Sequence, residues 1–178
     1  MPRPAEDKLP FVLSGGWPDA VPGSVVTLRE TGIVLGTLPL DDAEWRMLQS
    51  QRVFSLRVDE HPATDGWMTT HSDGTETRRV FGIPLAPVVV PSEALADGRD
   101  FSDWVWHVHG ALGRLLVWDE SRNWWIVQET DLELMLISAP RQMFGEKSDV
   151  LSWWDIGTVK GRRAVDALGA RYHVEWDE

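Results

Sequence analysis

Apolar and polar residues alternate over several short segments, and this two-residue period predicts β-strands. The clearest case is 132–138, where Leu132, Leu134 and Leu136 share one strand face that is fully apolar. Further strands are expected from β-branched or apolar runs over 24–28, 33–38, 53–58, 115–118 and 124–128. Because the last two of these and 132–138 follow one another closely, we expect three adjacent antiparallel strands at the centre of a sheet.

A helix is expected to begin after Asp41. The Asp41 side chain can cap its N-terminus, with Glu44 as the reciprocal acceptor three residues later. Leu40 and Trp45 can close a hydrophobic staple across the same start. The helix should continue to about Gln51 and bury Trp45.

The dipeptide formed by Asp73 and Gly74 predicts a β-hairpin with these residues at its tip. A two-residue type I′ turn needs positive φ at both central positions, and Asp-Gly adopts it at low cost. Counting outwards from this turn pairs Thr70 with Thr77. Both faces are largely polar near the tip, so the hairpin should project into solvent.

The rest of the chain completes an α+β pattern. Three prolines in 83–91 remove ladder donors, so this segment should be an edge strand or a crossing loop. Apolar positions at roughly helical spacing predict a last helix over 158–172. We therefore expect a mainly antiparallel sheet with two or three helices packed on it, as a single domain over 11–178 that follows a flexible arm over 1–10.

Two histidines in the sequence Trp-His-Val-His are candidate metal ligands. On a strand, His107 and His109 would point to one face and could share an ion, whereas on a helix they lie about 200° apart. The segment 102–113 fits a helix capped by Asp100 or Ser102, although its tryptophan and valine content fits a strand. We favour the helix, and a metal-dependent enzyme that uses both histidines stays an alternative.

Tryptophan is unusually frequent, with 11 residues in a chain of 178. Trp124 and Trp125 are neighbours in a predicted strand and must point to opposite faces, so we expect one ring in the core and the other exposed. Trp118 precedes the adjacent turn, and Trp153 and Trp154 form a second pair. The alternative for each ring is burial in a core that has few phenylalanine and tyrosine residues.

The formal net charge is −11, and the acidic excess is larger in the second half of the chain. Residues 90–178 carry 16 acidic and 9 basic side chains, against 12 and 8 in residues 1–89. Acidic residues flank the aromatic positions at Asp119, Glu120, Glu129, Asp131, Glu133 and Asp155. An acidic border around exposed rings complements a basic protein surface, whereas a solvated face that only aids solubility is the alternative.

Charge, composition and motifs disfavour several classes of function. The negative charge opposes binding to phosphates and to anionic lipid, so neither nucleic acid nor a membrane is an expected partner. Residues 1–10 lack the apolar core of a signal peptide, and we expect a cytoplasmic protein. The chain has no cysteine for disulfides, thiol catalysis or zinc sites. Common nucleophile and nucleotide motifs are absent, and we expect no cofactor.

These features predict a non-catalytic acidic binding protein. Its most concrete form is an inhibitor or immunity protein that neutralises a basic partner, such as a toxin nuclease, through an acidic face that bears tryptophan. The predicted interface residues are Trp118, Asp119, Glu120, Trp124, Trp125, Glu129, Trp153, Trp154 and Asp155. Because indole faces also stack on sugar rings, a carbohydrate-binding or carbohydrate-processing domain is the alternative.

Overall fold

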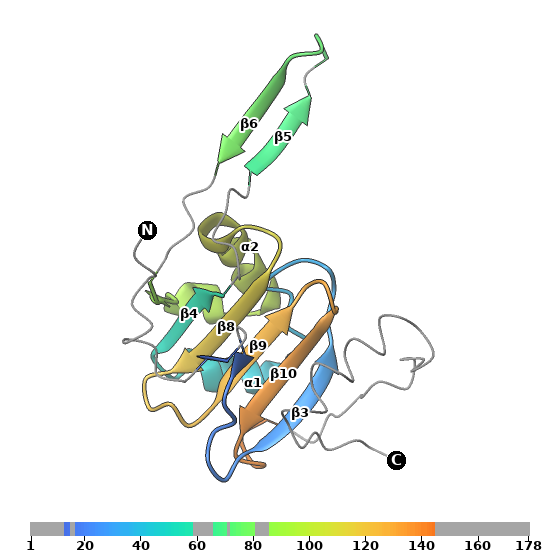
Figure 1. Cartoon of the computed structure of the whole chain (residues 1–178). Coiled ribbons are helices and arrows are strands. Elements are labelled where there is room, and N and C mark those ends of the chain that lie inside the picture. Colours follow the sequence, from blue (N-terminus) through green and yellow to red (C-terminus); the bar gives the residue numbers. More distant parts are fainter. Residues whose placement is uncertain (1–12, 15–16, 59–65, 71, 81–85, 145–178) are drawn as a thin grey trace.

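A computed structural model describes residues 13–14, 17–58, 66–70, 72–80 and 86–144 of the chain. Within these ranges six strands form one antiparallel sheet in the order β3-β10-β9-β8-β4-β7 (Figure 1). The six strands are β3 (Val25–Glu30), β4 (Val53–Arg57), β7 (Val88–Val89), β8 (Arg114–Asp119), β9 (Trp125–Glu129) and β10 (Leu134–Ala139). Two further pairs are β1 (Leu13–Ser14) with β2 (Trp17–Pro18) and β5 (Gly66–Thr70) with β6 (Glu76–Val80).

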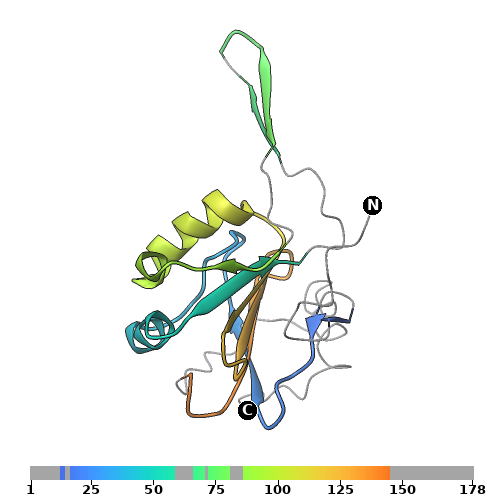
Figure 2. The same cartoon turned by 90° about the vertical axis from the view of Figure 1, so that its left-hand side faces the viewer.

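Two α-helices and a short 3-10 helix lie on one face of the six-stranded sheet (Figure 2). They are α1 (Asp42–Gln49), α2 (Gly98–His109) and the 3-10 helix η2 (Ser92–Leu95). This arrangement confirms the mainly antiparallel α+β fold for the described residues. The predicted arm over 1–10 and the predicted helix over 158–172 lie outside them, and the single domain over 11–178 stays a prediction.

The centre of the sheet is the meander β8-β9-β10, as the alternating pattern predicted. Trp118 pairs with Trp125 across β8 and β9, and Leu136 pairs with Val127 across β10 and β9. Of the segment 83–91 the structure describes 86–91, and there β7 is a two-residue strand at the edge of the sheet, as predicted.

Helix α1 begins with the capping box that the sequence predicted. The Asp41 carboxylate accepts hydrogen bonds from the backbone N–H groups of Ala43 and Glu44, both at 2.9 Å. The Glu44 side chain in turn accepts from the Asp41 N–H, also at 2.9 Å. These bonds satisfy N–H groups that no earlier helical carbonyl can reach.

Helix α2 confirms the helical interpretation of the His-x-His segment, but the predicted cap is wrong. The helix starts at Gly98, because the Asp97 carboxylate accepts from the N–H groups of Arg99 and Asp100. It ends at His109, where Gly110 takes a positive φ of 83°.

Both faces of the central strands are buried. The side chains that face the helices include Trp45, Leu48, Phe101, Val105, Leu115, Val117, Trp124, Ile126, Met135 and Ile137. The opposite face packs against Trp17 and the chain that follows it, through Val26, Leu28, Leu56, Leu116, Trp118, Trp125, Val127, Leu134 and Leu136. Alternation along the strands therefore separates two apolar layers, rather than a core from solvent.

The segment 33–38 is a loop, so the strand predicted there is wrong. The buried Gln128 side chain forms hydrogen bonds with backbone groups of this segment, which in a strand would bond to a neighbouring strand. Its Oε1 accepts from the Gly36 N–H at 2.6 Å, and its Nε2 donates to the Val34 carbonyl at 2.8 Å. A single long-range amide therefore overrides the local β-propensity of the segment.

The β5–β6 hairpin is confirmed, but its register differs by one residue from the prediction. Thr70 pairs with Glu76 rather than with Thr77. Only Gly74 of the two tip residues has a positive φ, and the Asp73 carboxylate accepts from the Thr75 N–H at 2.9 Å. The longer turn moves every pair by one residue. Figure 1 shows the hairpin apart from the six-stranded sheet.

Candidate functional site

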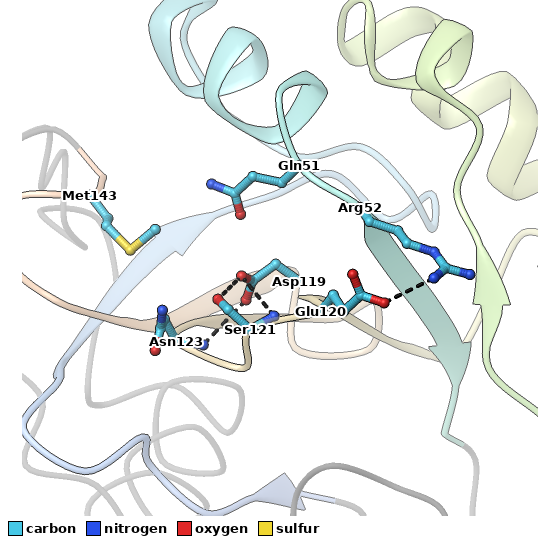
Figure 3. Close-up of a pocket in the computed structure, with 7 residues that line it drawn as sticks. All are labelled: Gln51, Arg52, Asp119, Glu120, Ser121, Asn123 and Met143. Carbon is cyan, nitrogen blue, oxygen red and sulfur yellow. Dashed lines mark hydrogen bonds and ion pairs between the residues drawn. The ribbon is translucent and has the colours of Figure 1, made fainter.

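The predicted interface centres on the turn between β8 and β9, beside a hollow of about 520 Å³ (Figure 3). The residues that line the hollow are Gln51, Arg52, Asp119, Glu120, Ser121, Asn123 and Met143. The connection between α1 and β4 thus faces the β8–β9 turn across it.

Asp119 holds the β8–β9 turn together through hydrogen bonds within the turn. It is buried, and its carboxylate accepts from the N–H groups of Ser121 and Asn123, both at 3.2 Å, and from the Ser121 hydroxyl. These bonds satisfy a carboxylate that has lost its hydration. Its predicted role at an exposed acidic border is therefore wrong.

Glu120 is exposed as predicted and pairs with Arg52 at 2.9 Å. Both side chains are more than half exposed, at 63% for Glu120 and 58% for Arg52. The neighbouring cation reduces the local negative field that this carboxylate can offer a basic partner.

The three tryptophans of the predicted interface are buried, so the expectation of an exposed ring there is wrong. Trp124 and Trp125 do point to opposite faces of the sheet, but both are 0% exposed. The Trp124 indole N–H donates to Gln51 Oε1 at 3.0 Å, and that of Trp125 donates to the Asp19 carbonyl at 2.9 Å. Trp118 is also buried. These three rings fill two apolar layers and offer no stacking face to a protein or a sugar.

Glu129 lies at the other end of β9 and is also buried. Its carboxylate pairs with the Arg114 guanidinium at 2.6 Å, and that guanidinium sits 4.2 Å from the Trp17 ring centroid. Burial raises the pKa of the Glu129 carboxyl above its ordinary value, and Arg114 offsets part of this effect. Its predicted role in an exposed border is wrong for the same reason as that of Asp119.

The predicted residues therefore do not form one exposed surface. Glu120 is the only exposed member among those that the structure describes. Trp153, Trp154 and Asp155 lie outside the described residues, and their interface role stays a prediction.

The two histidines point in different directions, so the hypothesis that they share a metal ion is wrong. His109 is fully buried and its Nε2 lies 2.8 Å from the Ser55 hydroxyl oxygen. His107 is exposed, with Nδ1 2.6 Å from the Asp103 carbonyl. The described part of the chain also holds no cluster of three or more residues suited to a metal ion.

Acid should destabilise the fold through His109. Burial lowers the pKa of its imidazole from 6.5 to about 4, and the nearby Arg57 charge adds to this shift. Between these two pH values the unfolded chain binds a proton that the folded protein excludes, so stability falls as the pH falls, by about 3 kcal/mol in total. His109→Gln should remove this contribution in urea unfolding measured at several pH values. His107→Gln is the matched control and should keep the wild-type slope, so equal slopes in all three proteins contradict the assignment.

Exposed acidic side chains gather on η2 and α2 rather than at the predicted turn. Glu93, Asp97, Asp100 and Asp103 are exposed, and Arg99 is the one arginine or lysine of these two helices. Asp97 caps the helix, whereas Asp100 and Asp103 have no ion-pair partner among the described residues.

A half-buried tryptophan lies beside these acids. Trp104 packs against Phe101, with ring centroids 6.2 Å apart, and meets the His109 ring edge-on at 5.7 Å. Asp100 is four residues before Trp104, so the two share one side of the helix. The spacing Asp-x-x-Asp-Trp, taken with the favoured helix, is the sequence signal that could have identified this acidic helical face.

Comparison of the chain with protein-family models, with curated proteins and with solved structures gives no match. Within the described ranges no helix is both long enough and apolar enough to cross a bilayer.

Proposed function

We propose that this chain is a non-catalytic acidic binding protein of the cytoplasm that neutralises a basic protein, as an immunity protein neutralises a toxin nuclease. The observation that carries the proposal is the acidic helical face, formed by Glu93, Asp97, Asp100 and Asp103 beside Trp104. Acidic side chains that have no ion-pair partner among the described residues, on a chain of net charge −11, attract a cationic partner over a distance of about one Debye length. A nuclease whose cleft must attract phosphate presents the complementary charge.

Affinity capture of the tagged full chain from its native host, at low ionic strength, tests this function. We expect a stoichiometric basic protein that salt releases and whose activity the chain abolishes when the two are mixed. Capture of a stoichiometric neutral or acidic partner, or of none, would argue against the proposal.

Reversing one charge on the acidic helical face should slow association with that partner. For Asp103→Lys we expect the association rate constant at low salt to fall by roughly tenfold, with little change in dissociation, because steering acts before contact. Glu120→Lys is the matched control, since it makes the same change of charge at an exposed carboxylate already paired with Arg52. Stopped-flow kinetics measures both rates, and equal effects of the two variants would place the steering charge elsewhere.

A further inference from the structure

Exposed aliphatic side chains cluster at one end of the sheet. Four large hydrophobic residues of the described chain are exposed, and three of them lie on two loops: Ile33 at 61%, Val34 at 37% and Leu112 at 56%. The fourth, Val89, lies on the edge strand β7. Single exposed aliphatic residues are ordinary, whereas a group of them is typical of a contact surface.

The loops that carry these side chains are fastened to each other. The Leu35 N–H donates to the Ala111 carbonyl at 2.8 Å, which joins the loop after β3 to the loop after α2 next to the exposed residues. Gly36 lies directly on α2, because a Cβ atom there would come within 2.7 Å of the Val105 Cβ. This close approach, together with a φ of +89°, requires glycine at position 36.

Buried polar side chains form hydrogen bonds with the backbone of these loops. Gln128 is fully buried and bonds to Gly36 and Val34, as described above. The Thr130 hydroxyl accepts from the Gly113 N–H at 2.9 Å and lies 3.0 Å from the Gly113 carbonyl oxygen. The backbone under the exposed side chains is therefore ordered before any partner arrives, which lowers the entropic cost of binding.

A third loop brings acidic residues to the same end. The Thr31 N–H donates to the Glu133 carbonyl at 2.9 Å, so the β9–β10 loop lies against the end of β3. Glu30 and Asp131 are exposed there and have no ion-pair partner within the described chain. A pocket of about 500 Å³ opens beside Glu30, between 29–32 and 37–39.

Two cations at this end of the sheet are held in ion pairs, and a third, Arg57, donates to the His109 carbonyl at 2.9 Å. Arg29 is buried in an ion pair with Glu44 at 2.6 Å, and Arg114 pairs with Glu129 at the same distance. The exposed side chains of Glu30, Ile33, Val34, Leu112 and Asp131, which we name the loop-end surface, thus combine three aliphatic residues with two carboxylates at one end of the sheet. This surface complements an apolar side chain that is flanked by cations.

We propose that the loop-end surface is the docking surface for a basic protein, which inserts an apolar side chain flanked by lysine or arginine. The inference rests on the proposed function, since the basic character of the partner comes from it. The three aliphatic side chains bury apolar surface on binding. The two carboxylates favour a cationic partner over a neutral or anionic one.

Titration of the isotope-labelled full chain with three short peptides, followed by amide NMR shifts, tests this surface. A lysine–leucine peptide carries both features, a lysine–serine peptide only the charge, and a glutamate–leucine peptide only the apolar side chains. We expect the lysine–leucine peptide to shift amides in 31–35 and 111–113, and to bind Ile33→Ser/Leu112→Ser about tenfold more weakly than wild type. Val89→Ser is the matched control and should bind as wild type does.

The possible failures of this test are distinct. If the lysine–leucine peptide shifts other amides, or binds the double variant as tightly as wild type, the loop-end surface is overturned while the preference for a basic partner stands. If the glutamate–leucine peptide binds these loops as tightly as the lysine–leucine peptide, the basic partner is overturned, and with it the proposed function. Absence of binding by all three peptides overturns the docking surface.

Discussion

Trp125→Ala is expected to lower the free energy of unfolding by about 4 kcal/mol, because the ring is fully buried between strands and the covering chain. The substitution leaves a cavity beside Trp118 and Leu136 and removes the hydrogen bond to the Asp19 carbonyl. Urea unfolding followed by circular dichroism measures the loss without relying on tryptophan fluorescence.

Trp125→Phe is the companion variant. It keeps most of the apolar volume and loses the indole N–H, so a smaller loss of about 1–2 kcal/mol is expected. If Trp125→Ala leaves stability within about 1 kcal/mol of wild type but abolishes partner binding, the ring belongs to an interface, as the sequence had suggested.

Arg29→Ala should destabilise the protein by about 3–5 kcal/mol, because it leaves the buried Glu44 carboxylate without its cation. The two side chains form a bidentate pair at 2.6 and 2.8 Å, with exposed fractions of only 7% and 4%. The Arg29 guanidinium also donates to the Pro39 carbonyl at 3.0 Å. Urea unfolding compared with wild type gives the size of the effect.

The exposed pair of Arg52 and Glu120 provides the matched control. Arg52→Ala removes the same type of side chain at a comparable N–O distance of 2.9 Å, but solvent screens this pair, and a loss below about 1 kcal/mol is expected. Adding Glu44→Gln to Arg29→Ala should recover part of the lost stability, since it removes the buried charge. Similar losses for Arg29→Ala and Arg52→Ala would contradict the role of burial.

Two signals that span only a few residues are confirmed, whereas the predicted cap of α2 and the predicted two-residue turn at Asp73 and Gly74 are wrong. The capping box of Asp41 and Glu44 needs only the geometry of one helical turn, and the structure contains it. The meander β8-β9-β10 was likewise predictable, because short turns connect strands of clear alternation.

The candidate site was predicted poorly because exposure depends on what packs against each face. Trp124 and Trp125 point to opposite faces as predicted, yet both faces are covered, so neither ring reaches solvent. Ile33 and Val34 have the pattern of a strand, but the distant Gln128 fixes them in a loop with their side chains exposed.

The sequence by itself determined the strand periodicity, the start of α1 and the net negative charge of the chain. The first two depend only on neighbouring residues, and the net charge is a count of charged side chains. Only the tertiary structure decided which carboxylates are structural, as Asp119 and Glu129 are, and which face solvent, as Asp100 and Asp103 do. The physical reason is that burial and hydrogen bonding come from elements far apart in the chain, and a linear pattern does not encode which of them meet.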